Sequence, residues 1–345
     1  MNPDWKQFLL AQGAAVDGGR VAAFGDPSRE LAAARNGTVV CDLSHYGLIR
    51  VAGAEAREFL HSQLSSDVRS LADGQAQFSS YNTAKGRMLA SLLMWPDGGD
   101  AFLLQLAAEL AEPIRKRLAM FILRSKAKAE DVSDALVRIG VAGPDAGRAA
   151  AELFPMLPGA PLGVARSGIG TLLRLEPERF ELILAPAEAP AAWTRCLGHA
   201  TPAGHAAWDW LDIRAGWPRV TPATQEQFVP QMANLELIGG VSFKKGCYPG
   251  QEIVARTHYL GKVKRRMFLA HIAAPTAPAP GDELYSPDAG RQASGMIVNV
   301  APSPDGGFDA LAVVQVASAE AGDVRWKAPD GPRLTFRPLP YQVPT

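Results

Sequence analysis

Between residues 77 and 106, three apolar runs are separated by two turn signals, and this pattern constrains the fold more than any other feature. The runs QFSSY, MLASLLMW and AFLLQL have the length and composition of strands. NTAKGR and PDGGD, which separate them, are rich in residues that favour tight turns. The pattern therefore predicts a three-strand antiparallel meander.

Helices and further strands flank this meander. Before it, the strand-like GLIRVAG leads into residues 53–64, where Ala56, Phe59, Leu60 and Leu64 share one helical face. After it, residues 109–123 have a buried face at helical spacing, and the strand-like ALVRIGVAG follows. Strands that alternate with helices in this order predict an α+β fold with a ferredoxin-like α+β sandwich.

The sequence pattern changes towards the C-terminus. WDWLDIRAG reads as a helix that ends at Gly216, because Pro218 cannot continue it. After residue 265 the short apolar runs FLAHI, SGMIVNV, ALAVVQV and LTFRPL alternate with PDAG, PDGG and PDG turns, which is typical of a small antiparallel β-barrel or jelly roll. We therefore expect two interleaved α+β subdomains in residues 1–265 and a β-barrel domain in residues 266–345.

The composition excludes several classes of protein. Thirty-five basic and thirty-five acidic residues cancel, so no overall field attracts nucleic acid or an anionic membrane. The three cysteines, Cys41, Cys196 and Cys247, form no CxxC pair and no disulfide framework, and the N-terminus resembles neither a signal peptide nor a membrane anchor. These features predict a cytoplasmic protein with no membrane partner.

The known motifs of nucleotide enzymes, hydrolases and zinc proteins are missing from the sequence. It contains no phosphate loop, no dinucleotide fingerprint and no GxSxG elbow. The six histidines show no HxxxH or HxH pairing, so we predict no metal site.

The densest cluster of reactive side chains surrounds Cys247. Gly246 and Gly250 bracket the cysteine at a spacing that suits a tight turn, and Lys244 and Lys245 before it favour the thiolate, the form that attacks electrophiles or binds metal. The alternative is that Cys247 is a small hydrophobic residue in a turn.

Seven basic residues and one acid lie between residues 244 and 266. The acid is Glu252, and the bases are Lys244, Lys245, Arg256, Lys262, Lys264, Arg265 and Arg266. A local cationic surface in a neutral protein points to an anionic ligand, such as a carboxylate tail or a phosphate. A solvated cationic face without a ligand is the alternative.

The segment KGCYPGQEIVAR, residues 245–256, resembles the signature of the YgfZ-type folate-binding proteins, relatives of the glycine-cleavage aminomethyltransferase. Residues 42–68, 81–91 and 214–248 resemble the same family. The resemblance implies a three-domain, GcvT-like fold around a central opening that binds tetrahydrofolate.

A flat pterin needs aromatic walls and polar groups along its edge, and a glutamate tail needs cations. The candidate walls are Tyr81, Trp208, Trp210 and Trp217, and the candidate edge contacts are Gln231, Asn234, Gln251 and Glu252. The cations that we expect at the cofactor are Lys85, Arg87, Arg214, Lys245 and Arg256.

The turn at residues 85–91 departs from the aminomethyltransferase pattern. The aspartate used there for aminomethyl transfer falls on Ala90 or Ser91, and neither residue can accept a proton at neutral pH. Lys85 and Arg87 reverse the charge at this position, although Lys-Gly-Arg is also ordinary in a hairpin turn. We therefore expect folate binding without the glycine-cleavage reaction, and not a conventional enzyme.

The family resemblance implies support for the assembly or repair of iron–sulfur clusters and for cluster-dependent tRNA modification, with Cys247 as the functional thiol. Iron–sulfur proteins or their assembly factors would then be the partners. Two alternatives stay open: a folate-dependent one-carbon transferase or demethylase, and an RNA-binding module that contacts tRNA through residues 244–266.

Overall fold

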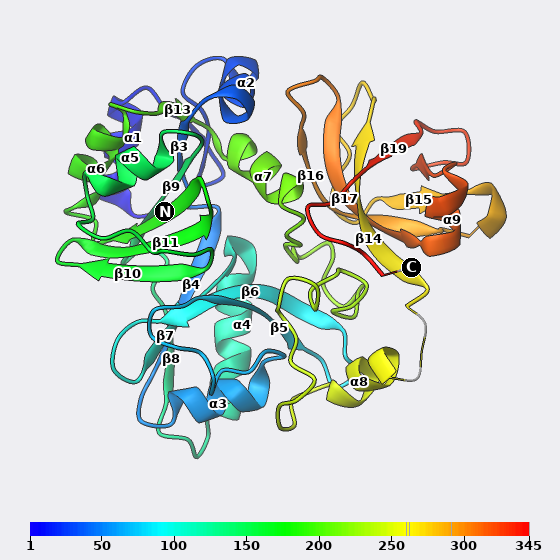
Figure 1. The fold of residues 1–345 in the computed structure, drawn as a ribbon, viewed down its shortest axis with the longest axis horizontal. Helices are drawn as coiled ribbons and strands as arrows, with labels where there is room; N and C mark the ends of the chain where they lie inside the picture. Colours follow the sequence, from blue (N-terminus) through cyan, green and yellow to red (C-terminus); the bar gives the residue numbers. More distant parts are fainter. Residues whose placement is uncertain (260, 262, 291, 345) are drawn as a thin grey trace. The chain divides into compact units, whose positions relative to one another are not determined.

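The computed structural model describes residues 1–259, 261, 263–290 and 292–344, which form helices, mainly antiparallel sheets and long irregular segments (Figure 1). The chain divides into two compact units. Unit 1 contains Met1–Arg57, Ser70–Gln77 and Leu93–Trp208, and unit 2 contains Glu58–Arg69, Phe78–Leu92 and Asp209–Thr345. No helix in the described part of the chain has both the length and the apolar character that a membrane crossing needs.

A six-stranded sheet with helices packed on it forms the core of unit 1. Its strand order is β10 (Gly163–Ser167), β11 (Gly170–Glu176), β12 (Arg179–Leu184), β9 (Val137–Ala142), β3 (Val39–Asp42) and β13 (Thr201–Ala203). The helices of this unit are α1 (Pro3–Ala11), α2 (Pro27–Asn36), α5 (Ala146–Ala151) and α6 (Ala189–Cys196), and β1 (Ala15–Asp17) pairs with β2 (Arg20–Ala23). Trp5 and Trp193 meet edge to face in the apolar core, and the Trp5 indole donates to Asp42 at 2.7 Å.

The predicted meander is present in a second sheet. The strand order is β5 (Gln77–Asn82), β6 (Met88–Pro96), β7 (Ala101–Ala107), β4 (Tyr46–Ala52) and β8 (Lys128–Asp131). Helix α4 (Ala108–Phe121) packs on β4, β7 and β8, and α3 (Ala56–Gln63) follows β4. These bounds confirm the strands and helices expected here and the α+β fold class.

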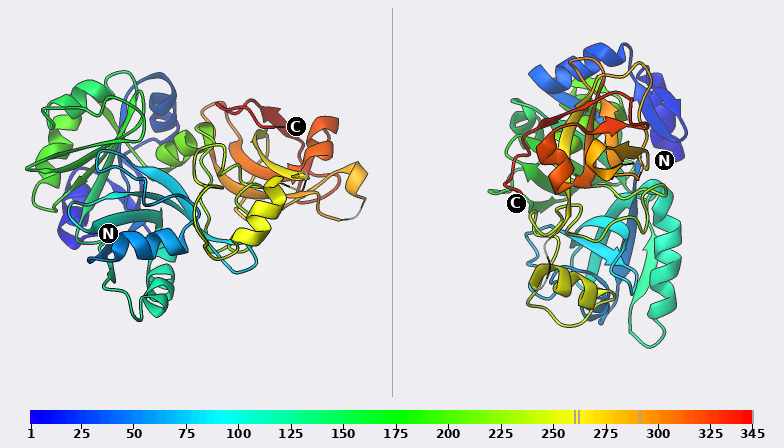
Figure 2. Two further views of the ribbon diagram at one scale, coloured as in Figure 1. Left: turned by 60° about the horizontal axis from the view of Figure 1, so that its bottom comes forward. Right: turned by 90° about the vertical axis from the view of Figure 1, so that its right-hand side faces the viewer.

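The C-terminal part of unit 2 is a curled antiparallel sheet. Its order is β18 (Arg325–Trp326), β15 (Glu283–Tyr285), β16 (Gly295–Pro302), β17 (Phe308–Gln315), β14 (Arg265–Ile272) and β19 (Leu334–Arg337). Its two edges approach each other, because Leu334 N–H donates to the Val324 carbonyl at 2.8 Å. Figure 2 shows this half-barrel in yellow to red. It confirms the predicted antiparallel tail, with the short helix α9 (Val316–Ala321) and a 3₁₀ turn at Pro287–Ala289 in addition.

An irregular segment, residues 215–250, connects two helices of the chain. Helix α7 (His205–Arg214) ends as predicted, since Gly216 adopts a left-handed φ of 71°, and α8 (Gln251–Tyr259) begins after Gly250. This segment contains Gln231, Asn234, Lys245 and Cys247, so irregular backbone rather than a helix or strand places these four candidate residues.

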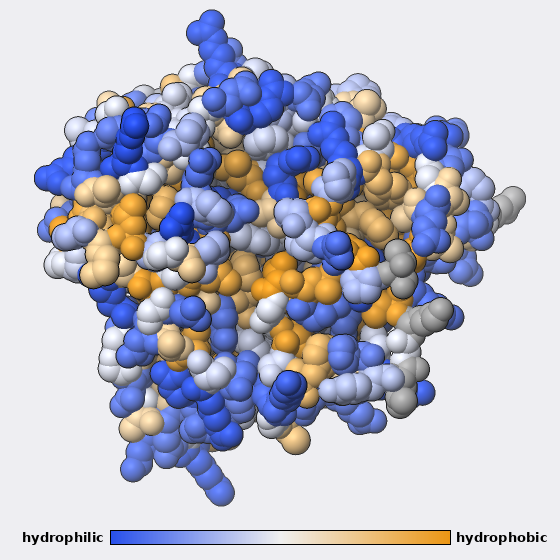
Figure 3. All heavy atoms as spheres, viewed as in Figure 1, coloured by the Kyte–Doolittle hydropathy of each residue, from blue (hydrophilic) through white to orange (hydrophobic). Residues whose placement is uncertain are grey.

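The surface combines polar and apolar side chains. On the face shown in Figure 3, hydrophilic residues cover much of the area, with hydrophobic residues between them. Such a mixture is usual for folded proteins, because their polar side chains are too few to cover the whole surface.

Candidate functional site

Lys245 anchors the segment that contains Cys247, residues 242–250, to the C-terminal end of α3. Its ammonium donates to the carbonyl of Leu64 at 2.5 Å, to that of Ser66 at 3.1 Å, and to that of His61. The last carbonyls of a helix lack partners within the helix and carry the negative end of its dipole, so a cation is favoured there. All three N–H donors of Lys245 are thus used within unit 2, which indicates that Lys245 anchors this segment rather than contacting an anionic ligand. We call Lys245 and the three carbonyls that it binds the clamp.

The charges around this clamp include His61, which sequence analysis considered only as one of six histidines without metal-site spacing. Burial lowers the pKa of Lys245 to about 8. Burial, and then the charge of Lys245, lowers the pKa of His61, whose Nδ1 lies 3.1 Å from Asp67. His61 therefore favours the neutral form. Its Nε2 would lie 3.9 Å from a Cβ added at Gly246, so the imidazole neighbours the backbone next to Cys247.

Cys247 is the one cysteine of the three that is exposed. Cys41 and Cys196 are completely buried, and burial raises the pKa of Cys196 to about 12. The functional thiol proposed from sequence is thus accessible to a reagent or a partner, whereas the other two are not.

Thiol labelling tests this arrangement. Under native conditions, Ellman's reagent is expected to modify one thiol rapidly, because thiolate character and exposure govern the reaction. All three cysteines should react after denaturation. A Cys247→Ser variant should show no fast phase, and a fast phase in that variant would contradict the assigned exposure.

The β5–β6 turn packs against the start of α8. Gly86 and Gly250 approach so closely that a Cβ added at Gly250 would lie 2.5 Å from the Cα of Gly86. Lys85 is exposed at this turn, and Arg87 donates to the Gln227 carbonyl at 2.5 Å. Both cations lie on a hairpin turn, and Arg87 already has a protein partner.

The two residues that replace the transferase aspartate are buried in unit 2. Ala90 is completely buried, and the Ser91 hydroxyl accepts a hydrogen bond from Val220 N–H at 2.9 Å. The serine oxygen is therefore engaged by the backbone, and neither side chain supplies a carboxylate.

The aromatic candidates are mostly packed inside the protein. Trp208 belongs to unit 1, where it is 1% exposed and its ring lies 4.1 Å from the Arg179 guanidinium. All other candidate residues belong to unit 2. There Tyr81 is 1% exposed, and the Trp210 indole donates to Asp309 at 2.9 Å. Trp217 lies 5.1 Å from the ring of Phe78. These contacts account for the tryptophans as packing residues.

The basic residues predicted between positions 244 and 266 differ in burial. Lys245 and Arg266 are buried and bound to protein acceptors, and Lys262 lies outside the described residues. Lys244, Arg256, Lys264 and Arg265 are exposed. The exposed cationic surface is thus smaller than the sequence suggests.

The remaining polar candidates lie in different environments. Arg214 is exposed at the end of α7, and Glu252 is exposed in the first turn of α8. Gln251 donates to the Lys245 carbonyl at 3.4 Å, so it supports the clamp segment. Asn234 is buried at a left-handed φ of 57° and donates to the Met267 carbonyl at 2.8 Å.

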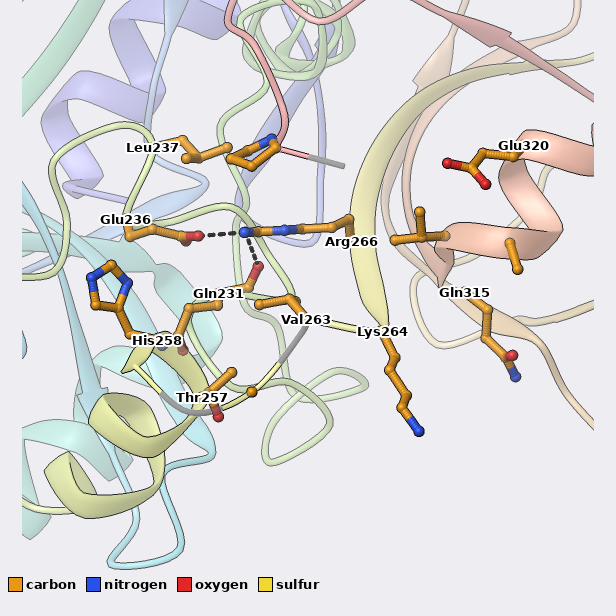
Figure 4. A pocket seen from close by; sticks show the side chains of 14 residues that line it. Gln231, Glu236, Leu237, Thr257, His258, Val263, Lys264, Arg266, Gln315 and Glu320 are labelled. Carbon is orange, nitrogen blue, oxygen red and sulfur yellow. Dashed lines mark hydrogen bonds and ion pairs between the residues drawn. The ribbon is translucent and has the colours of Figure 1, made fainter.

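A cavity of about 670 Å³ opens in unit 2 beside Gln231 (Figure 4). Its floor contains Gln231, Glu236 and Arg266, all at least nine-tenths buried. Arg266 donates to the Gln231 carbonyl at 2.8 Å and pairs with Glu236. Sequence analysis found Gln231 and counted Arg266 in the basic run, but it missed Glu236, because no local motif marks this glutamate.

Three polar atoms in this floor have no hydrogen-bond partner among the described residues: Gln231 Oε1, Glu236 Oε2 and Arg266 Nε. Burial raises the pKa of the Glu236 carboxyl, although the Arg266 pair opposes this shift. Buried polar groups are usually satisfied, so these three atoms are exceptions among the buried polar groups of this floor. Within the described residues, no group of three or more His, Cys, Asp and Glu side chains could hold a metal ion.

Comparisons with known proteins identify the family. Residues 14–161 match the model of the GCVT N-terminal domain. The chain is 32% identical over 320 residues to the tRNA-modifying protein YgfZ of Escherichia coli O157:H7. This alignment covers 92% of this chain and 97% of that protein. The K12 strain's YgfZ matches equally well, with 32% identity over 92% of the chain.

A solved structure confirms the fold over almost the whole chain. The glycine cleavage system aminomethyltransferase T from Bartonella henselae superimposes with a TM-score of 0.80 and 20% identity. The match covers 99% of this chain and 97% of that one. With the sequence relatives, this similarity shows that the chain belongs to the YgfZ family and has the fold of the GcvT aminomethyltransferases.

Proposed function

We propose that this protein binds a reduced folate, such as tetrahydrofolate, and supports iron–sulfur cluster assembly or repair and the tRNA modification that depends on it. Cys247 is the functional thiol. The observation that carries this proposal is the exposed Cys247 on a segment fixed by a buried lysine. The relatives' name, tRNA-modifying protein, supports the process, and the aminomethyltransferase fold supports folate as the ligand.

The position of Cys247 fits thiol chemistry better than packing. A structural cysteine is typically buried, as Cys41 and Cys196 are, whereas a reactive one must be reached by its target. Clusters usually take four cysteine ligands, so a single thiolate holds one only together with other ligands. We therefore propose that an iron–sulfur protein, an assembly factor or a small thiol supplies the other ligands of the cluster. The effect on tRNA is then indirect, through modifying enzymes that depend on such clusters.

One-carbon transfer is the competing function, and two residues of β6 argue against it. Ala90 has no proton-accepting group, and Ser91 already accepts a backbone hydrogen bond. A transferase would need a carboxylate or another base beside the folate amines, which these two residues do not provide.

The decisive experiment compares Cys247→Ser with Cys196→Ala, which also removes a thiol but leaves the exposed one. In cells depleted of the native protein, Cys247→Ser is expected to reduce cluster-dependent tRNA modification by about tenfold or more, because the thiolate is the reactive form. Modified nucleosides are measured by mass spectrometry, together with the activity of an iron–sulfur enzyme.

Tetrahydrofolate affinity, measured by calorimetry, should stay unchanged in Cys247→Ser, and Cys196→Ala should restore modification fully. Full rescue by Cys247→Ser would overturn the role of the thiol. Absence of folate binding in the wild type would instead overturn the folate part of the proposal.

A further inference from the structure

We propose that the exposed side of α8, together with the two chain segments beside it, binds single-stranded RNA. Its residues are Lys85, Lys244, Arg256, Tyr259 and Lys264, all of them exposed, and we call this set the α8 surface. The inference goes beyond the proposed function, in which the effect on tRNA is indirect. Only the choice of RNA as the nucleic acid rests on that function.

Residues 242–250 lie against the C-terminal end of α8. The Phe243 ring stacks on the His258 imidazole at 3.7 Å with an interplanar angle of 12°, and it meets the Tyr259 ring edge to face at 6.2 Å. Lys244 follows Phe243 in the chain, and Lys264 lines the same cavity as His258. Two exposed cations thus border the end of the helix at which Tyr259 lies.

The β5–β6 turn lies against the start of α8 (Figure 1). A Cβ added at Gly86 would lie 3.1 Å from Ile253 Cβ, and Lys85 precedes this glycine in the chain. Arg256 lies between Ile253 and Tyr259, one helical turn from each, so the three side chains follow one another along the helix. The α8 surface therefore extends from the turn at Lys85 to Tyr259.

The charge of the α8 surface is complementary to a phosphate backbone. In the described part of the chain, none of its four cations forms an ion pair with a carboxylate. Helix α8 contains one acid, Glu252. Because the whole chain has no net charge, this local excess of cations, and not an overall field, would attract a polyanion.

Tyr259 distinguishes this surface from an ordinary solvated cationic face. Its ring is 65% exposed, although it is held edge to face against His258 at 4.7 Å with an interplanar angle of 80°. A positioned aromatic ring with an open face, surrounded by cations, is the combination on which unpaired bases stack while their phosphates are neutralised. A base must leave its helix to stack in this way, so the surface fits a single strand better than a duplex.

An acidic protein segment is the competing occupant of the α8 surface. Its carboxylates would pair with the same cations, but it would offer Tyr259 a flat ring only at an aromatic residue. Each nucleotide supplies a phosphate and a flat base together, which is why we favour RNA.

Fluorescence anisotropy on the full-length protein tests the proposal. The probe is a labelled, unstructured RNA of alternating cytidine and adenosine, about 12 nucleotides long. The logarithm of its association constant is expected to fall with the logarithm of the salt concentration, with a slope of about −2 to −3, because each of four neutralised phosphates contributes about −0.7. Arg256→Gln should make this slope shallower by about 0.7.

The aromatic contact is tested with a matched pair of variants. Tyr259→Ala is expected to weaken RNA binding by about 5–100-fold, whereas Tyr259→Phe, which keeps the ring, should bind like the wild type. Phe121→Ala is the control, since Phe121 is also an exposed aromatic residue at the last position of a helix, but in α4 and outside the α8 surface. It should leave RNA binding unchanged.

Three outcomes would overturn the proposal: no RNA binding by the wild type at low salt, equal affinity of Tyr259→Ala and the wild type, or equally tight binding of an RNA duplex. Polyglutamate is the probe for an acidic protein, and tighter binding of polyglutamate than of RNA would assign the surface to such a partner instead. Folate affinity and rapid labelling of Cys247 should not change in Tyr259→Ala. Their loss would point to a failure of the fold or of the proposed function, whereas loss of RNA binding alone supports the α8 surface.

Discussion

Replacing Lys245 with methionine is expected to lower the free energy of unfolding by about 2–4 kcal/mol. Each buried carbonyl left without its donor costs about 1–3 kcal/mol, and a water molecule that binds to one of these carbonyls reduces the total. The variant keeps most of the aliphatic length but removes all three donors to the end of α3. Urea denaturation followed by circular dichroism measures the change. Hydrogen exchange should also become faster in residues 242–250, because the segment loses its anchor.

The neighbouring Lys244 provides the control for this prediction. It is exposed, and Lys244→Met removes the same charge from the same segment. Its expected effect is within about 0.5 kcal/mol, as for most surface substitutions. Equal urea midpoints for the two variants would show that the clamp contributes nothing measurable.

The buried Lys245 also predicts the direction in which the free energy of unfolding changes with pH. Burial lowers the pKa of Lys245 to about 8, below its ordinary value of 10.5. Between these values the unfolded chain binds the proton more tightly than the folded one, so folding becomes more favourable as the pH rises. The stability of the wild type relative to Lys245→Met should therefore increase from about pH 8 to pH 10.5. A constant difference over this range would contradict the lowered pKa.

Local patterns predicted the regular elements of this chain well, because hydrophobic periodicity and turn residues act over a few positions. The strands β5, β6 and β7, the helix α4 and the end of α7 at Gly216 all follow from such signals. The conformation of segment 215–250 could not be predicted in this way, because it depends on contacts with residues distant in sequence rather than on its own periodicity.

The candidate site shows more clearly that contacts between residues distant in sequence cannot be predicted from local patterns. Sequence identified Cys247 and Gln231, since the first lies in a long motif and the second in a segment that resembles the family. It could not show that Lys245 binds carbonyls about 180 positions earlier in the chain, or that Glu236 pairs with Arg266 across 30 positions. A run of basic residues likewise says nothing about which ammonium or guanidinium groups are buried, and burial decides which of them can meet a ligand.

Gly250→Ala is expected to be among the most damaging single-methyl changes in unit 2, with a loss of about 2–5 kcal/mol from backbone strain and overpacking together. Gly250 has a φ of 79°, and an added Cβ would lie 2.5 Å from Gly86 Cα, Gly86 N and the Thr83 carbonyl oxygen. All three are backbone atoms, so no flexible side chain can move aside. The β5–β6 turn and the start of α8 would have to separate, which would displace the chain three residues after Cys247.

Gly239 separates the two causes of this loss. Its φ of 80° nearly equals that of Gly250, but an added Cβ would meet nothing within 4 Å. Gly239→Ala should therefore cost only the left-handed strain, about 1–2 kcal/mol. The difference between the two alanine variants, measured as urea midpoints at constant slope, isolates the close approach of Gly250 to Gly86. Equal losses would mean that the turn can shift at no cost and that the close approach of Gly250 to Gly86 does not hold Cys247 in place.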